Sequence, residues 1–202
     1  PQATRMFMSP WQQPKNADGS WNINLSTSVF NTPYLAEKNI QTNDGTRALS
    51  NSKVSFSIND NLKLSSRIAI DYTLGSSHEF RDPNHGDGAS RNGTAYEAIS
   101  RNFLWQTVNE LEYNEVFGDN EHFISALLRQ SYSNNKSNFM SAFGTNVAAE
   151  GLYYVASFNT NETGYSSFGD YKELGYLALA NYSYKDKYVL DLSFRNDGSS
   201  RF

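Results

Sequence analysis

The sequence predicts an all-β protein, specifically a segment of an antiparallel transmembrane β-barrel. Three observations lead to this prediction. Apolar and polar residues alternate with a period of two in several runs, as in half-buried strands. The connections between these runs alternate between short polar turns and long segments. Aromatic residues make up 14% of the chain, and many lie near the ends of the runs.

The first hairpin is predicted from the alternating runs 53–58 and 62–74, which flank the polar turn 59–61. In the second of these runs, leucine, isoleucine and tyrosine side chains share one face, whereas Arg67 and Asp71 lie on the other. One face therefore suits an apolar environment and the other suits water.

Two further hairpins show the same pattern. Their strands and turns are 103–116, 118–120 and 124–132 for the second hairpin, and 176–184, 185–187 and 188–195 for the third. Together with a short run near Arg5, this predicts about seven strands.

Long connecting segments are predicted at about 8–45, 75–101 and 133–172. Bacterial outer-membrane barrels have short periplasmic turns and longer extracellular loops, so the three short turns are assigned to the periplasmic side. Amphipathic rings near the strand ends are expected to form interfacial girdles; they are Tyr72, Phe103, Trp105, Tyr113, Phe117, Phe123, Tyr132, Tyr182, Tyr184 and Tyr188.

Composition excludes several other classes of protein. The net charge of −4 and the lack of a basic patch argue against nucleic-acid binding. The chain has no cysteine, which excludes disulfides and thiolate metal sites. No run of about 18 apolar residues could form a transmembrane helix, but a barrel strand needs only about 9–11 residues.

The third hairpin also carries a family resemblance. Residues 174–202 include NYSYKDKY and SFRNDGSSRF, and the whole stretch is similar to the pattern SYFGRLNYSYKDKYLLTASFRRDGSSRF of SusC/RagA-like TonB-dependent transporters. Segments 10–20, 31–39 and 150–154 resemble the family more loosely. The chain departs from the pattern at Leu179, where the family has arginine, and at Ala178, where it has glycine.

The resemblance implies that residues 1–202 are part of a single TonB-dependent receptor-type barrel of 22 strands. It also implies that the TonB box, the plug and the N-terminal domains are not in this chain. The expected function is import of oligosaccharides or peptides across the outer membrane of a Gram-negative, Bacteroidetes-type bacterium. The implied partners are a SusD-like surface lipoprotein, TonB through the plug, outer-membrane lipid and a second transporter–lipoprotein pair that completes a dimer.

The alternation assigns several polar side chains to the barrel lumen: Arg67, Asp71, Glu110, Glu112, Arg129, Asn181, Asp191 and Arg195. Aromatic residues in the long segments are candidates for contact with substrate or partner: Trp11, Trp21, Tyr153, Tyr154, Tyr165 and Tyr171. Stacking of these rings within the loops themselves is the alternative.

No catalytic motif or cofactor is predicted, and the chain is not expected to be an enzyme. The three histidines, at 78, 85 and 122, lack the spacing of a metal site. Asp82, Asn84 and Asp87 place oxygen ligands near glycines, a pattern compatible with calcium, but no glutamate closes the loop as in an EF-hand. A polar loop explains the same residues.

The alternation is also compatible with two other classes of protein. A soluble β-sandwich, such as a carbohydrate-binding or adhesin module, would also show alternation, and a passive porin would share the barrel wall. The sandwich does not account for the resemblance in residues 174–202, and the porin would lack the plug and show no dependence on TonB. The sequence does not identify the nutrient.

Overall fold

A computed structural model of the chain describes residues 8, 11–25 and 29–201, with the side chains of 161 and 162 excepted. The chain divides into two compact units. Unit 1 comprises Pro1–Gly45, Leu74–Ser100 and Phe139–Ser167, and unit 2 comprises Thr46–Thr73, Arg101–Asn138 and Phe168–Phe202.

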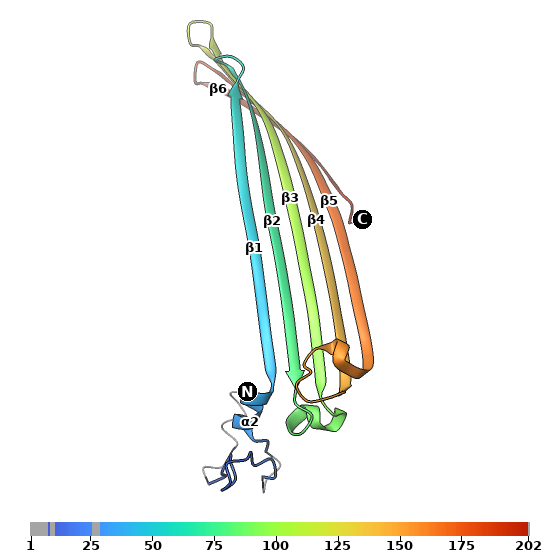
Figure 1. Cartoon of the computed structure of the whole chain (residues 1–202). Coiled ribbons are helices and arrows are strands. Elements are labelled where there is room, and N and C mark those ends of the chain that lie inside the picture. The colour runs from blue at the N-terminus through green and yellow to red at the C-terminus, as the bar shows by residue number, and fades with distance from the viewer. Residues whose placement is uncertain (1–7, 9–10, 26–28, 202) are drawn as a thin grey trace. The chain divides into compact units, whose positions relative to one another are not determined.

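The described residues form one six-stranded sheet in which the strands follow chain order, β1 to β6 (Figure 1). The strands are β1 (Ile40–Ser57), β2 (Leu62–Arg81), β3 (Thr94–Phe117), β4 (His122–Val147), β5 (Phe158–Tyr184) and β6 (Tyr188–Ser199). Consecutive neighbours pair antiparallel, which confirms the predicted fold class.

The three short connections lie where the sequence predicts them, and all belong to unit 2. In the first, the Asn59 side chain accepts hydrogen bonds from the backbone N–H groups of Asn61 and Leu62. In the third, Lys185 and Asp186 both have a φ of 53°, which matches the primed turns that suit the twist of hairpins. Local turn chemistry therefore fixes where these strands reverse.

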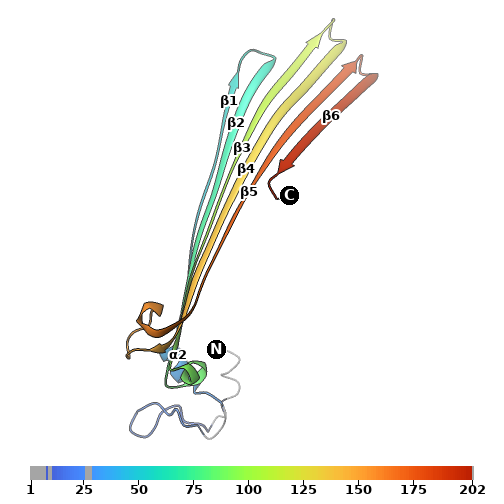
Figure 2. The same cartoon turned by 90° about the vertical axis from the view of Figure 1, so that its right-hand side faces the viewer.

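Strands β5 and β6 lie side by side (Figure 2), and they pair antiparallel in a defined register. Ala178 pairs with Phe194 and Ala180 pairs with Leu192, whereas Asn181 pairs with Asp191. Because side chains alternate between the faces of a strand, the first two pairs share one face and the third lies on the other. The two-faced hairpin predicted for 176–195 is confirmed.

Unit 1 contains the helices and the small hydrophobic core. Among its described residues, the helices are α2 (Thr32–Lys38) and the 3-10 helices η1 (Gly86–Arg91) and η2 (Val155–Ser157). Asn31 caps α2 by accepting a hydrogen bond from the Tyr34 backbone N–H. The core consists of Phe80, Ala95, Val147, Val155 and Phe158. Among the described residues, no helix is both long and apolar enough to cross a bilayer.

The predicted extents of the long connections are wrong. The second and third connections contain only residues 82–93 and 148–157, because β2 to β5 continue well beyond their alternating runs. The segment predicted at 8–45 contains α2, and β1 begins within it at Ile40. The predicted short strand near Arg5 lies outside the described residues.

Candidate functional site

Unit 2 presents an apolar face and a polar face. The apolar face includes Val54, Ile68, Leu128, Leu192 and Phe194, and all five side chains are exposed. Phe194 retains 63% of its accessible surface and Val54 retains 71%. So many exposed apolar side chains on one face are unusual for a protein that faces water and typical of one that contacts lipid or another protein.

The polar face carries a chain of ion pairs between strands. Arg129 Nε contacts Glu110 Oε1 at 2.7 Å, and Lys53 Nζ lies 3.8 Å from Glu110 Oε2. Arg47 makes two hydrogen bonds to Asp71, at 3.0 and 2.7 Å. Each pair is partly exposed to solvent, which screens the attraction between its charges, so each adds little to stability. Their main effect is to hold long side chains in fixed positions along the face.

All eight residues predicted to face the lumen lie in unit 2. Arg67, Glu110, Arg129 and Arg195 line one hollow of about 340 Å³. Asp71 pairs with Arg47, and the Glu112 carboxylate lies 4.0 Å from Lys63 Nζ. The Asn181 amide donates to Asp191 Oδ1 at 2.5 Å across the β5–β6 pair. The structure thus brings four of the eight together, and their exposure to a transport path stays a prediction.

Sequence reasoning missed Asp197 and Gly175, which also line this hollow. The Arg195 guanidinium donates to both carboxylate oxygens of Asp197, at 2.6 and 3.2 Å. Gly175 pairs with Asp197, and a Cβ at Gly175 would lie 2.7 Å from Ser131 Oγ and 2.8 Å from Asp197 Oδ1. The two-residue spacing of Arg195 and Asp197 was the available signal for a shared face.

In unit 1, the segment that precedes β1 is fastened to the 82–93 connection. The Tyr34 hydroxyl donates to Asp82 Oδ2 at 2.7 Å, and the backbone N–H groups of Asn84 and His85 donate to the same oxygen. The Asn31 backbone N–H donates to His85 Nε2 at 2.7 Å. Burial, followed by the hydrogen bond to Asp82, raises the pKa of Tyr34 to about 12, so its phenol stays protonated and donates.

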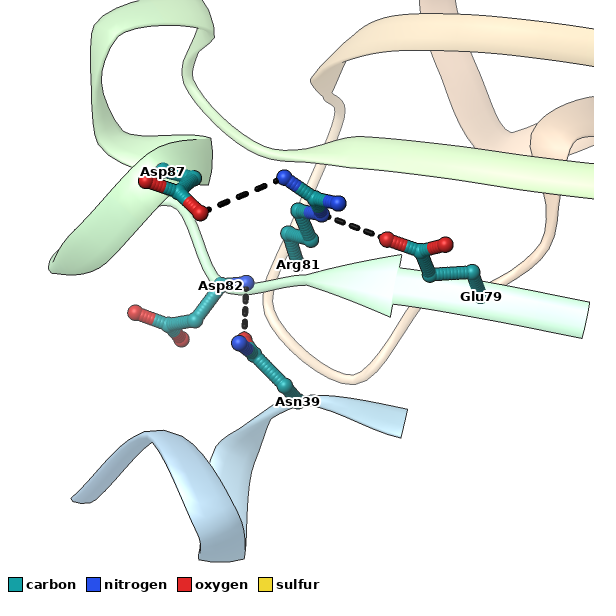
Figure 3. Close-up of polar contacts among 5 residues, drawn as sticks. All are labelled: Asn39, Glu79, Arg81, Asp82 and Asp87. Carbon is teal, nitrogen blue, oxygen red and sulfur yellow. Dashed lines mark hydrogen bonds and ion pairs between the residues drawn. The ribbon is translucent and has the colours of Figure 1, made fainter. Parts of the chain in front are cut away.

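The same connection is tied to the end of β2 (Figure 3). Asn39 Oδ1 accepts a hydrogen bond from the Asp82 backbone N–H at 2.8 Å. Arg81 lies between two carboxylates, with Nε 2.5 Å from Glu79 Oε1 and Nη1 3.4 Å from Asp87 Oδ2 (Figure 3). The Arg81–Asp87 pair thus holds the connection to the end of β2, and Asn39 holds it to the residue that precedes β1.

These contacts bear on the weak calcium hypothesis for Asp82, Asn84 and Asp87. The Asp82 carboxylate already accepts three hydrogen bonds, and the Asp87 carboxylate pairs with Arg81. Within the described residues, no group of three histidine, cysteine, aspartate or glutamate side chains is placed to hold a metal ion. The polar-loop explanation accounts for each of these contacts.

The six aromatic candidates have different environments. Trp11 is 76% exposed, whereas the Trp21 ring packs edge-on against Tyr34 with 5.8 Å between centroids. In the 148–157 connection, Tyr153 packs against Phe80 and Tyr154 stacks on His78. Three of the six rings thus pack inside unit 1, against a residue of α2 or of β2, and contact of any of the six with substrate or partner stays a prediction.

The prediction that Tyr165 and Tyr171 lie in a loop is wrong, because both are residues of β5. Tyr165 is exposed and packs against Phe139 of β4. The Tyr171 hydroxyl accepts a hydrogen bond from the Asn135 amide at 3.2 Å, and Arg201 lies 3.7 Å from the centre of its ring. Contact of either tyrosine with a substrate stays a prediction.

Comparisons with known proteins agree with this two-faced sheet. No protein-family model matches the chain. It is 27% identical over 206 aligned residues to TonB-dependent receptor P26 of Formosa agariphila. This alignment covers 96% of the chain and 20% of that receptor. In fold, it matches the RagAB peptide transporter with a TM-score of 0.77 at 21% identity.

Two other structures, of the RagAB peptide importer in its open-open and closed-closed states, give TM-scores of 0.75 and 0.76. Each RagAB match covers 94% of the chain and 22% of the solved chain. The predicted resemblance to SusC/RagA-like TonB-dependent transporters is therefore confirmed in sequence and in fold. The chain spans about a fifth of the length of these relatives.

Proposed function

We propose that the chain forms part of the wall and outer loops of a TonB-dependent importer in the outer membrane of a Gram-negative, Bacteroidetes-type bacterium. The observation that carries this proposal is the exposed apolar face of unit 2, formed by paired strands. Backbone groups in hydrocarbon must be hydrogen-bonded within the protein, and a closed β-barrel is one of two structures that achieve this.

Two groups of aromatic rings in unit 2 support a membrane-spanning band. One group lies beside the short turns, where Phe117 stacks on His122 and His122 packs against Tyr184. The other contains Trp105, which packs against Tyr132. Trp105 and Phe117 are 12 residues apart on β3. At about 3.3 Å per residue and a tilt of about 45°, this separation spans about 28 Å, close to the thickness of a bilayer core.

The polar face then lines the passage, and the proposed cargo is an oligosaccharide or a peptide. Similarity to a TonB-dependent receptor and to the RagAB peptide transporter supports this assignment. In this scheme the plug that contacts TonB lies outside the chain, and residues 1–202 belong to one barrel domain. A SusD-like lipoprotein contacts the outer loops, where Trp11 and Tyr154 are exposed, and two transporter–lipoprotein pairs form a dimer.

Sidedness provides a direct test. The full-length protein is expressed in its host with a single added cysteine, either Tyr154→Cys in a long connection or Asp186→Cys in a short turn. Intact cells are treated with a membrane-impermeant maleimide. We expect the first variant to be labelled in intact cells and the second only after the outer membrane is opened. Equal labelling of both in intact cells contradicts the proposed orientation.

Dependence on TonB distinguishes the importer from a porin. Uptake of labelled peptides and oligosaccharides is compared between cells with and without TonB. An importer loses uptake when TonB is removed, because opening requires energy from the inner membrane. Uptake that continues at the same rate identifies a passive pore and contradicts the proposal.

A further inference from the structure

Arg67 stands apart from the other charged side chains on the polar face of unit 2. The carboxylates of this face have partners: Asp71 with Arg47, Glu110 with Arg129, and Asp197 with Arg195. The remaining three carboxylates also have partners. Glu112 lies beside Lys63, Glu173 accepts a hydrogen bond from Ser133, and Asp191 accepts one from Asn181. Within the described part of the chain, the Arg67 side chain makes no ion pair, hydrogen bond or ring contact.

The Arg67 side chain is exposed and lines the hollow of about 340 Å³ described above. Three guanidinium groups and two carboxylates line this hollow, so its local charge is positive on a chain whose net charge is −4. Gly175 and the small side chain of Ser131 leave space in this hollow, because any side chain at Gly175 would fill the space beside Ser131 and Asp197.

A free guanidinium presents five N–H donors in a planar fork that matches the two oxygens of a carboxylate. Glu110 and Asp197 are held by Arg129 and Arg195, and each therefore keeps its own partner. What the hollow lacks is one anion of the right shape to reach Arg67.

We propose that Arg67 is a binding residue for a carboxylate group of the imported molecule, at a subsite also lined by Arg129 and Arg195. The proposal rests on the proposed function and adds a substrate class: molecules that carry a free carboxylate. Such a group can come from a peptide C-terminus or from an acidic sugar. Both sources present the same planar pair of oxygens to the guanidinium.

The test uses the full-length transporter purified in detergent and two matched pairs of probes. The first pair is an N-acetylated octapeptide of glycine and serine with a free C-terminal carboxylate, and the same peptide as its C-terminal amide. The second pair is tetragalacturonic acid and its methyl ester. Calorimetry gives a dissociation constant for each probe with the wild type, Arg67→Gln, Arg67→Lys and Arg101→Gln. Arg101 is an exposed cation of β3 outside the hollow, so its variant controls for net charge.

We expect the wild type to bind the carboxylate form of at least one pair more tightly than its neutral form. Arg67→Gln weakens that binding about tenfold and leaves the neutral form unchanged, as loss of a charge-assisted hydrogen bond predicts. Arg67→Lys recovers part of the loss, because it keeps the charge without the planar fork. Arg101→Gln binds like the wild type. The pair that shows the preference identifies the peptide or the sugar as the source.

The proposal is overturned if the wild type prefers neither carboxylate form, or if Arg67→Gln binds both members of each pair like the wild type. It is also overturned if Arg67→Gln weakens every probe equally and lowers the unfolding temperature, because Arg67 then pairs with another part of the transporter. The proposed function fails on a different result, namely uptake that does not depend on TonB.

Discussion

The Asn109 side-chain amide donates to Gln130 Oε1 at 2.8 Å, from β3 to β4, on the apolar face of unit 2. Ser66 Oγ of β2 donates to Asn109 Oδ1 at 2.7 Å and extends the chain of hydrogen bonds to a third strand. These polar residues sit two positions from Ile68, Leu111 and Leu128 on their own strands. Each polar group is tolerated in apolar surroundings because its neighbour satisfies it.

Replacing the middle residue should reveal this dependence. Asn109→Leu leaves Ser66 and Gln130 without their partner and is expected to destabilise the barrel by about 1 kcal/mol. The measurement is the thermal unfolding midpoint of the full-length protein in detergent. The triple variant Ser66→Ala, Asn109→Leu, Gln130→Leu removes all the polar groups and should recover the loss. A triple variant less stable than Asn109→Leu alone refutes this account.

Gly88→Ala should disrupt the 82–93 connection. Gly88 is buried, and a Cβ there would lie 2.5 Å from the Asp82 carbonyl oxygen and 2.9 Å from that of Arg81, both backbone atoms. The connection must shift to relieve the clash, and we expect faster proteolytic cleavage within it. Gly164→Ala is the matched control, because a Cβ at that position meets nothing within 4 Å. Equal cleavage rates for the two variants would show that the backbone tolerates the added atom.

The contact between His85 and Asn31 should depend on pH. Burial lowers the pKa of His85 below its ordinary 6.5, against a smaller opposing effect of Asp82. Its Nε2 accepts a hydrogen bond and must be unprotonated. The unfolded state therefore takes up a proton more readily, so this contribution is complete above pH 6.5 and declines as pH falls through the lowered pKa.

Hydrogen exchange of the Asn31 amide, corrected for intrinsic rates, measures this effect between pH 7.5 and pH 5, a window chosen to bracket the ordinary histidine pKa of about 6.5. We expect protection to fall toward acid in the wild type. In His85→Gln, the glutamine side chain does not titrate in this range, so protection of the Asn31 backbone N–H should be constant. A decline of the same size in both proteins assigns the effect to another group.

The 202-residue chain produced alone should aggregate in aqueous buffer, because Leu190, Leu192 and Phe194 of β6 remain exposed. Detergent should keep it in solution with a β-sheet circular dichroism spectrum. Replacing these three residues with serine should increase the fraction that stays in the supernatant after centrifugation. A monodisperse wild-type chain in water without detergent would favour the soluble-sandwich alternative.

The sequence predicts the strands of unit 2 well, because their two faces meet different surroundings. Residues 188–195 alternate cleanly, and the register of β5 with β6 confirms the faces. The part of β2 in unit 1 lacks this pattern, since Ser76 and Ser77 are adjacent, and so does the end of the unit 2 part of β4, where Asn134 and Asn135 are adjacent. A strand whose two faces have similar polarity carries no period-two signal, so these stretches resemble loops in the sequence.

The contacts of unit 1 were harder to predict. The cap of α2 has a local signal, since Asn31 precedes Thr32-Pro33 and proline favours the first turn of a helix. The pairing of Tyr34 with Asp82 joins residues 48 positions apart. No period or spacing in a single sequence encodes such a contact. On the polar face, alternation identified the right strand faces but not the hydrogen-bond partners, which depend on register.

The unequal connections have a consequence for the order of assembly. Residues 58–61 and 185–187 close the hairpins of β1 with β2 and of β5 with β6, whereas β2 must reach β3 through residues 82–93. Closing a loop of 12 residues costs about 1 kcal/mol more entropy than closing one of four. The hairpins with short turns should therefore form first. The sheet should then grow by pairing of complete hairpins rather than by addition of single strands.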